Sequence, residues 1–245
     1  MYRRYVMIQR LIINNICILR RAVGMILYHG SNNIIKQPFL GGGKIYNDYG
    51  QGFYCTDKIE LAKEWACTEE ISAYVNKYEL DMSEMKILDL SKEKYSVLNW
   101  LAILLRYRRI RITSPIMKRG MEWLIEYFSI DISEYDIIIG YRADDSYFSF
   151  ARAFINNQIS LRQLEYAMDL GELGIQYVLK SEKAFKTLKY VGYEVVDRNV
   201  YYRKRKRRDE AARQAYMQEL ENEVGDGIFI RDLMKEGVKQ NETRL

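Results

Sequence analysis

The chain has few of the residues on which common kinds of functional site depend. Its 245 residues include one histidine, His29, and three cysteines, Cys17, Cys55 and Cys67. The cysteines are not spaced like metal ligands, and their odd number argues against a framework of disulfides. These counts predict a cytoplasmic protein whose thiols stay reduced, and they give no reason to expect a metal site.

Long apolar runs are also missing. The stretch LIINNICIL, residues 11–19, is nine residues long and contains two asparagines, so it is too short to span a bilayer. It follows basic residues, as the apolar part of a secretory signal does, but no small-x-small cleavage site comes after it. We therefore expect no membrane association. The glycine-rich stretch 27–56 lacks both G-x-G-x-x-G and a P-loop, which argues against two common nucleotide sites.

Charge is distributed unevenly along the chain. The net charge is +5, but the first 24 residues contain five arginines and no acidic residue, so the remainder is about neutral. A second basic run, RKRKRR, occupies residues 203–208. Such a run attracts phosphates, although most runs of this kind are solvated helix ends or tails. Contact with nucleic acid is therefore an alternative and not the leading interpretation.

Length and composition predict one folded domain with appendages. Hydrophobic residues make up 48% of the chain, which is enough for a full-sized core. A regular pattern begins abruptly at Met25, in MILYHG, and the composition changes to a charged helix at Arg203. We therefore expect an upstream extension or N-terminal arm at 1–24, a folded domain at 25–202, and a basic helical tail outside the core at 203–245.

Strands and helices alternate in the predicted pattern of elements. Asp57 and Glu60 have the spacing of a capping box, and Ser160 and Ser181 are suitable helix caps. Apolar runs and alternation predict strands at 25–30, 53–56, 72–82, 86–90, 135–140, 174–181 and 193–196. Helical spacing predicts helices at 56–70, 92–109, 115–129, 149–157, 160–170, 181–190 and 203–223.

The stretch LYHGSNNIIKQPFLGGGKIYNDYGQGFYCT, residues 27–56, gathers the only histidine, three consecutive glycines and a second Gly-x-Gly. His29 ends a predicted strand and is followed by Gly30 and Ser31, so its imidazole lies where the backbone turns and a ligand can approach. By itself, one histidine with an ordinary pKa of about 6.5 is explained equally well as a core residue.

Several segments together resemble a known family. LYHGS, DYGQGFYCT, the A-x-x-W-A pattern of the next helix, ADDSYF and LGIQYVLKSEKAFKTL are similar to bacterial ADP-ribosyltransferase-like proteins of the DUF3990 family, within the wider His-Tyr-Glu ADP-ribosyltransferase superfamily. The resemblance extends from about Met25 to about Gly192. It implies an α+β fold of split antiparallel β-sheets, with surrounding helices and an NAD cleft between the sheets.

The resemblance also implies roles for individual residues. On the pattern of the family, His29 hydrogen-bonds the adenine-side ribose of NAD and Tyr54 stacks on the nicotinamide. We expect these two side chains to converge on one pocket. Tyr46 and Tyr49 are alternative aromatic platforms or core residues. The other members of the implied cofactor-binding set are Gly30, Ser31, Gly52 and Phe53.

The third motif of the superfamily departs from the usual pattern. Its glutamate is replaced here by Gln176, in LGIQYVLKS. Glutamine can hydrogen-bond a ribose hydroxyl, but it has no charge with which to stabilise an oxocarbenium ion and cannot act as a base. Either Gln176 positions NAD while Asp144 or Asp145 supplies the catalytic carboxylate, or the domain binds NAD without much transfer. By pattern alone, Asp144 and Asp145 are equally well explained as a solvated turn.

The activity that the resemblance implies is NAD-dependent transfer of ADP-ribose to a macromolecular acceptor, protein or nucleic acid, with NAD as substrate and no metal. A free transferase of this kind is hazardous to its host. We therefore expect a toxin of a toxin-antitoxin or phage-defence system, restrained by an antitoxin protein. The alternatives are a catalytically weak NAD or ADP-ribose-binding module and a basic-tailed nucleic-acid-associated protein.

Overall fold

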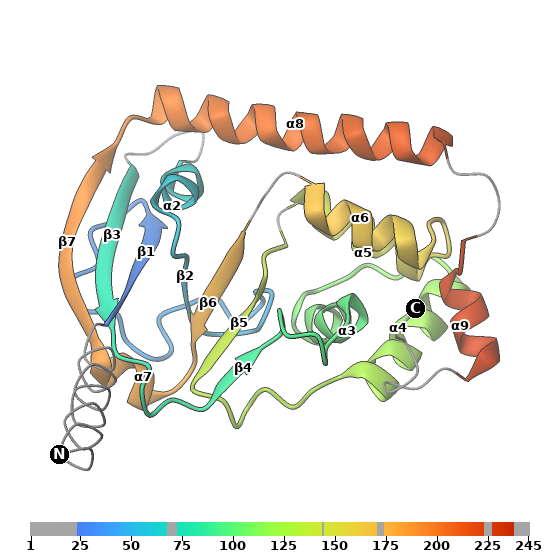
Figure 1. The fold of residues 1–245 in the computed structure, drawn as a ribbon, viewed down its shortest axis with the longest axis horizontal. Coiled ribbons are helices and arrows are strands. Elements are labelled where there is room, and N and C mark those ends of the chain that lie inside the picture. The colour runs from blue at the N-terminus through green and yellow to red at the C-terminus, as the bar shows by residue number, and fades with distance from the viewer. Residues whose placement is uncertain (1–23, 68–72, 144, 171–173, 223–226, 238–245) are drawn as a thin grey trace, which may run out of the picture.

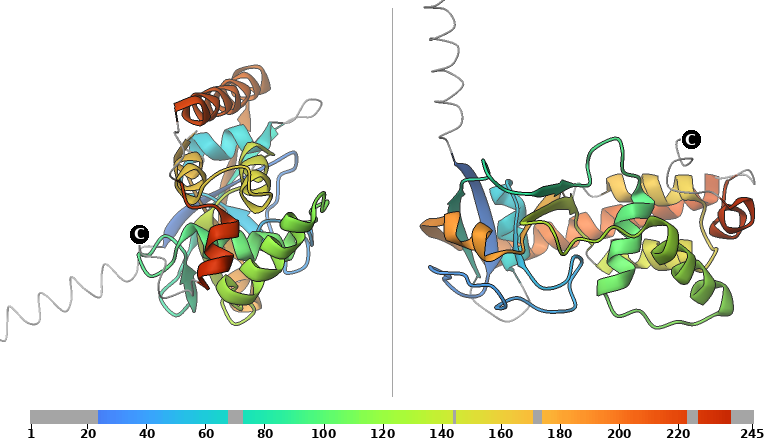
Figure 2. Two further views of the ribbon diagram at one scale, coloured as in Figure 1. Left: turned by 90° about the vertical axis from the view of Figure 1, so that its right-hand side faces the viewer. Right: turned by 90° about the horizontal axis from the view of Figure 1, so that it is seen from below.

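The protein is described here by a computed structural model in which two β-sheets stand side by side and helices pack beyond the second sheet (Figure 1). The molecule is elongated along the direction that leads from the first sheet through the second to the helices (Figure 2). The expected N-terminal extension lies outside the described residues. The structure describes residues 24–67, 73–143, 145–170, 174–222 and 227–237.

The first sheet has three antiparallel strands in the order β1-β3-β7. The alternating residues of 72–82 form its central strand, as their pattern predicts. The third strand starts at Leu188 and not at the expected residue 193, because Leu188 already pairs with Leu80. The strand bounds are β1 (Met25–Ser31), β3 (Ala73–Leu80) and β7 (Leu188–Val196).

The second sheet has four strands in the order β2-β6-β5-β4. Its β4 and β5 are parallel, so the expectation that both sheets are wholly antiparallel is wrong. Two helices lie between these strands in the chain, and a connection of that length lets the second strand return in the same direction. The bounds are β2 (Phe53–Cys55), β4 (Ile87–Asp89), β5 (Ile137–Tyr141) and β6 (Ile175–Leu179).

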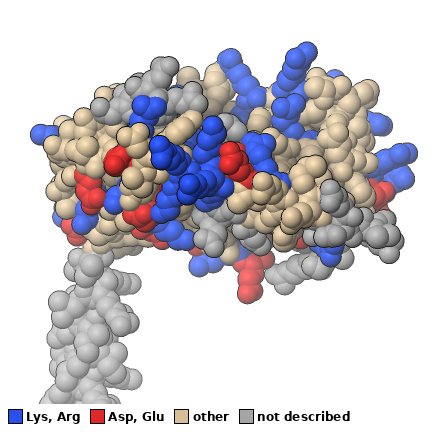
Figure 3. Space-filling view, turned by 90° about the horizontal axis from the view of Figure 1, so that it is seen from above, with Lys and Arg blue, Asp and Glu red and all other residues tan. Residues whose placement is uncertain are grey.

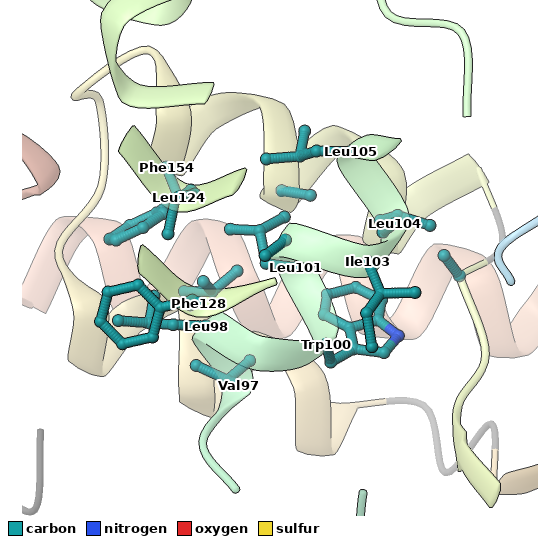
Figure 4. Packing of buried hydrophobic residues seen from close by; sticks show 14 of the residues in the cluster. Val97, Leu98, Trp100, Leu101, Ile103, Leu104, Leu105, Leu124, Phe128 and Phe154 are labelled. Atoms are coloured by element: carbon teal, nitrogen blue, oxygen red, sulfur yellow. The ribbon is translucent and has the colours of Figure 1, made fainter. Parts of the chain in front are cut away.

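The main hydrophobic core surrounds helix α3, whose residues from Val97 to Leu105 are all buried. Leu124 and Phe128 of α4 and Phe154 of α5 belong to the same cluster as Trp100 of α3 (Figure 4). Helices and sheets together therefore agree with the α+β class that the sequence predicts. The helix bounds are α2 (Ile59–Ala66), α3 (Val97–Tyr107), α4 (Pro115–Phe128), α5 (Asp145–Ile155), α6 (Leu161–Asp169), α7 (Glu182–Thr187), α8 (Arg198–Asn222) and α9 (Ile230–Glu236).

Two of the three predicted helix caps are confirmed. The hydroxyls of Ser160 and Ser181 accept hydrogen bonds from backbone N–H groups in the first turns of α6 and α7. The capping box expected at Asp57 is wrong, because Lys58 is the N-cap residue of α2 and makes no side-chain cap. The backbone N–H of Lys58 donates to the hydroxyl of Thr56 at 3.2 Å, so Thr56 closes this turn instead.

The tail does not lie outside the core as expected. Tyr216 of α8 and both Ile230 and Leu233 of α9 belong to the main hydrophobic cluster. Helix α8 begins five residues before Arg203 and runs along the top of Figure 1, from the end of β7 to α5 and α6. A single aromatic residue among charged ones gives little apolar periodicity, which explains why the sequence pattern does not predict this packing.

The basic run of α8 packs partly on α2. Arg208 Nε donates to the buried carboxylate of Glu64 at 2.9 Å, and Lys204 Nζ lies 2.9 Å from Glu60 Oε2. Figure 3 looks down on this side, where Lys and Arg side chains gather near the middle of the face. The run is therefore partly neutralised within the protein. Across the described ranges, no helix combines the length and apolar character that a bilayer crossing requires.

Candidate functional site at the junction of the sheets

His29 lies at the junction of the two sheets. Its Nδ1 is 2.6 Å from the backbone oxygen of Tyr54, and its ring stacks on Phe53 with centroids 4.3 Å apart. A carbonyl can only accept, so Nδ1 carries the proton and Nε2 has the free lone pair of the neutral imidazole. Burial lowers the pKa of His29, and the bond to Tyr54 opposes this shift. The imidazole is therefore neutral at pH 7 and can accept a hydrogen bond through Nε2.

Gly30 and Ser31 continue β1 beyond His29. A Cβ at Gly30 would collide with the carbonyl oxygen of Ala62, so the glycine lets α2 pack directly against the strand. Its missing side chain is thus used for internal packing. Ser31 is partly exposed, and its hydroxyl accepts a hydrogen bond from the backbone N–H of Asn33 at 3.1 Å.

Tyr54 lies in the middle of β2, on the opposite face of the strand from His29. Phe53 belongs to the cluster beneath the first sheet, whereas the ring of Tyr54 packs against the main core. Because neighbouring side chains of a strand alternate, His29 and Tyr54 do not face each other across one pocket, as we had expected. They are joined by the Tyr54 carbonyl. Since β2 is the edge strand of its sheet, both faces are close to that edge.

The Tyr54 hydroxyl is used inside the protein. It donates to the Gly50 carbonyl at 2.6 Å and accepts from the Tyr49 N–H at 3.0 Å. Burial raises the pKa of Tyr54, so the hydroxyl stays protonated. The hydroxyl is therefore not free for a ligand, and the partly buried ring packs against the main core. The preceding Gly52 is buried against Val178 of β6.

Gln176, the third-motif residue, is buried at the centre of the second sheet. Its Nε2 donates to Asp48 Oδ2 and to the Tyr141 carbonyl, each at 3.0 Å. Asp48 also accepts from the backbone N–H of Ala143 at 2.9 Å, and its Oδ1 lies 3.4 Å from Arg108 Nη1. A carboxylate therefore does lie beside the third motif, but it comes from the DYG segment of the second motif.

Burial raises the pKa of Asp48. Its hydrogen bond from Ala143 and the charges of Arg108 and Arg142 act in the opposite direction. With only 3% of its surface exposed, Asp48 is placed to hold the surrounding loops together. Its contacts define a buried network that links the second motif, the third motif and the end of β5.

The two alternative aromatic residues differ in environment. Tyr49 is fully buried, and its hydroxyl donates to the Tyr141 carbonyl at 2.9 Å, so it is a core residue. Tyr46 is 51% exposed, and the guanidinium of Arg109 lies 3.7 Å from its ring centre. Tyr46 is thus accessible to a ligand, but it lies in the connection between β1 and β2, whereas His29 and Tyr54 lie in the strands themselves.

Trp65 and Arg142 connect α2 with the end of β5. The Arg142 guanidinium lies 4.0 Å from the centre of the Trp65 ring, which is favourable cation–π geometry. The indole N–H of Trp65 is buried and has no hydrogen-bond partner among the described residues. A buried donor without an acceptor is uncommon in proteins. Trp65 therefore offers a hydrogen bond to a ligand acceptor beside the Gly30 end of β1, where α2 packs.

Only one of the two expected catalytic aspartates belongs to a described element. Asp144 lies outside the described residues, and Asp145 is the first residue of α5. Within the described ranges, no three His, Cys, Asp or Glu side chains gather in a way that can hold a metal ion. The groups available at the junction are therefore an imidazole, aromatic rings, an indole N–H and two arginines.

Sequence reasoning missed Asp48, Arg108 and Arg142, and it included Trp65 in the A-x-x-W-A pattern without assigning it a role. Asp48 and Trp65 both lie inside segments that carry the family resemblance, so their position was an available signal. The arginines gave none, because each follows an element whose end could not be fixed from the pattern.

Comparison with known proteins gives one match. A family model described as protein of unknown function (DUF3990) matches residues 25–190, from the start of β1 into β7. The comparisons with curated proteins and with solved structures gave no match. The matched region contains the whole sheet junction, whereas α8 and α9 lie beyond it. Because the match covers more than half of the chain, the protein belongs to the DUF3990 family.

Proposed function

We propose that the protein is an NAD-dependent ADP-ribosyltransferase that modifies a macromolecular acceptor. The observation that carries this proposal is a continuous chain of contacts from His29 to Gln176. His29 bonds to the Tyr54 carbonyl, the Tyr54 hydroxyl bonds to Tyr49, and the neighbouring Asp48 bonds to Gln176. Residues of three distant sequence motifs thus form one connected network at the sheet junction.

The chemistry requires little more than binding and orientation. The bond between the ribose C1′ and the nicotinamide nitrogen breaks, and its electron pair leaves with neutral nicotinamide. A nucleophile of the acceptor then bonds to C1′ and gives its proton to solvent. Because the transition state resembles an oxocarbenium ion, groups that fix the ribose and the leaving ring lower the barrier.

The junction has groups suited to these tasks. Nε2 of His29 can accept a hydrogen bond from a ribose hydroxyl. The ring of Tyr54 lies on the opposite face of β2, so in this proposal the dinucleotide bends around the edge of β2 to place the nicotinamide beside it. The indole N–H of Trp65, which has no partner among the described residues, donates to an oxygen of the dinucleotide. Arg142 is held over the same ring, and its charge has the sign that a pyrophosphate requires.

Labelling with NAD that carries a radioactive adenylate tests the proposal. The untagged protein is incubated with labelled NAD and cell extract, followed by protease or nuclease to identify the labelled polymer. Transfer of label to a polymer is expected. No transfer, together with no release of nicotinamide, would reject the activity.

Paired variants test the site. Tyr54→Leu removes the ring and should abolish labelling, whereas Tyr54→Phe removes only the hydroxyl and should keep measurable labelling at temperatures where it is folded. Tyr46→Leu is the matched control for the other accessible aromatic residue. If Tyr46→Leu abolishes labelling and Tyr54→Leu does not, the nicotinamide platform is assigned wrongly.

The second candidate is an NAD or ADP-ribose-binding module without turnover. It is favoured by the environment of Gln176, whose amide group is already bound to Asp48 and Tyr141 and has no negative charge. Calorimetry separates the two candidates. Saturable NAD binding without nicotinamide release supports the module, and binding with release supports the transferase.

The biological setting follows from the transferase proposal. Unrestrained transfer of ADP-ribose inside a cell damages the host, so a toxin controlled by an antitoxin protein or used in phage defence is the setting that we propose. Co-expression with the product of an adjacent gene should then relieve growth inhibition by the wild type.

A further inference from the structure

A polar cavity of about 720 Å³ lies between α4 and α9, outside the sheet junction. These helices pack beside each other at the end of the molecule far from the first sheet (Figures 1 and 2). Its volume is within the range of small-molecule sites, roughly 300–1,000 Å³. Its lining includes Arg119 of α4, Arg231 and Lys235 of α9, and the turn at Asn156 and Asn157.

The charge of this cavity is entirely of one sign. Arg119, Arg231 and Lys235 are exposed, and the side chains form no ion pair with any residue in the described part of the chain. None of the described residues that line the cavity is acidic or aromatic. A concave surface with charge of one sign focuses the electrostatic potential and attracts counterions. The cavity is therefore suited to an anion.

The geometry of the cavity is set by tight packing. Ile230 of α9 fits against Gly120 of α4, where a Cβ would lie 2.8 Å from its Cδ1 atom. The side chain of Asn157 then accepts a hydrogen bond from the backbone N–H of Arg231 at 3.0 Å. Asn157 has a φ of 60°, which is uncommon for a residue other than glycine. These contacts fix the first turn of α9 and hold Arg231 at the cavity.

A smaller cavity of about 170 Å³ adjoins the first, because both are lined by Asn156. It adds a fourth cation, Arg152, together with the hydroxyl of Thr113. Cations from α4, α5 and α9 therefore line two cavities that have Asn156 in common.

We propose that this cavity binds a small molecule carrying a chain of two or more phosphates. Arginine forms paired hydrogen bonds with phosphate oxygens, and several cations favour a multiply charged ligand over a single anion. Single-stranded nucleic acid is the less suitable ligand, because its binding sites stack bases on aromatic rings and the described lining has none. Arg119 and the turn at Asn156 and Asn157 lie within the family match, whereas Arg231 and Lys235 of α9 lie beyond it.

Calorimetry with tripolyphosphate tests this proposal on the full chain. The wild type should bind saturably, and Arg231→Gln/Lys235→Gln should weaken binding at least tenfold. The matched control is Lys206→Gln/Arg207→Gln, which removes the same charge from exposed positions of α8 and should change the affinity less than twofold. Adenosine triphosphate in a second series determines whether a nucleoside attached to the phosphates adds affinity.

Three results would overturn the proposal. One is the absence of saturable binding, and another is equal weakening by the two double variants, which would indicate attraction by net charge alone. The third is binding of a single-stranded oligonucleotide that depends on Arg231 and Lys235 while tripolyphosphate does not bind. None of these results depends on whether the sheet junction binds NAD.

Discussion

The sheet junction and the α4–α9 cavity use polar side chains in opposite ways. At the junction, Asp48 contacts both Gln176 and Arg108, and Asp48 and Gln176 are buried. In the cavity, Arg231 and Lys235 face solvent and have no ion-pair partner among the described residues. Polar groups that are bonded within the protein determine its shape and stability, whereas groups without partners remain available for a ligand.

The junction contains both kinds of group. The amide of Gln176 and the hydroxyl of Tyr54 are bonded internally, while Nε2 of His29 and the indole N–H of Trp65 have no hydrogen-bond partner among the described residues. By this criterion we expect His29 and Trp65 to contact a ligand, and we expect Gln176 and Asp48 to position the loops. Substitutions of internally bonded groups should therefore differ in their effect on stability from substitutions of groups without an internal partner.

The largest effect is expected from Gln176→Glu. It replaces an amide nitrogen 3.0 Å from Asp48 with a carboxylate oxygen, so two buried negative charges repel each other. We expect the free energy of unfolding at pH 7 to fall by about 3–5 kcal/mol, the usual range for disrupting a buried charge contact. Part of this loss should be recovered at pH 5, where one of the carboxyls is protonated.

Denaturant unfolding at the two pH values measures the Gln176→Glu effect. The double variant Asp48→Asn/Gln176→Glu restores one donor and one acceptor at this contact and is the control. Equal stability of Gln176→Glu and the wild type at pH 7 would contradict the contact between Gln176 and Asp48. If NAD hydrolysis rises in the variant, residue 176 occupies the catalytic position.

A smaller loss is expected from Arg208→Gln in α8. The variant leaves the carboxylate of Glu64, whose side chain is 3% exposed, without its ion-pair partner. We expect the free energy of unfolding to fall by about 2–3 kcal/mol, less than for a fully buried pair because Arg208 is partly exposed. Its neighbour Arg207 is exposed, and Arg207→Gln should change stability by about 0.5 kcal/mol or less. Equal effects in chemical denaturation would show that α8 does not dock on α2.

Between pH 8 and pH 5.5, His29, the only histidine, should contribute to the pH dependence of stability. Burial places its folded-state pKa below the unfolded value of about 6.5. Its contribution is complete above pH 6.5 and is lost as the pH falls through the folded-state pKa, because the unfolded chain takes up the proton first. The stability difference between the wild type and His29→Gln should therefore shrink from pH 8 to pH 5.5. A difference that grows instead would mean that the imidazole is charged in the folded protein.

The smallest effect is expected in the cavity. Without a ligand, Arg231→Gln and Lys235→Gln should each change the free energy of unfolding by about 0.5 kcal/mol or less, because neither exposed side chain forms an ion pair with a described residue. Thermal unfolding without and with tripolyphosphate separates stability from binding. A large loss of stability without ligand would show that these two side chains stabilise the fold, which would contradict their assignment as groups available to a ligand.

The sequence predicted local structure better than contacts between distant segments. The β-branched run of β5, the alternation of β3 and the caps at Ser160 and Ser181 are determined by neighbouring residues, and all are present. The parallel pairing of β4 and the packing of α8 and α9 depend on residues far apart in the chain. Periodicity could not predict them, because Tyr216 alone gives no apolar stripe.

The difference between local structure and contacts of distant segments also applies to the candidate site. Strand ends and glycines directed attention to His29 and Tyr54, and both lie at the junction. Asp48 bonds to Gln176 across 128 positions of the chain, and no spacing rule connects residues at such a distance. The alternation of side chains along β2 was predictable. That His29 and Tyr54 do not face each other also depends on how β1 lies beside β2, which the pattern does not give.

The most direct test of the account is an NMR titration of the imidazole nitrogens with NAD. The chain, prepared without a histidine tag, gives one pair of imidazole signals, so the assignment to His29 is unambiguous. We predict the Nδ1-protonated tautomer in the free protein, and a saturable shift of the Nε2 signal as NAD is added. If NAD binds, as calorimetry would show, and the His29 signals do not move, the NAD site is not at the sheet junction.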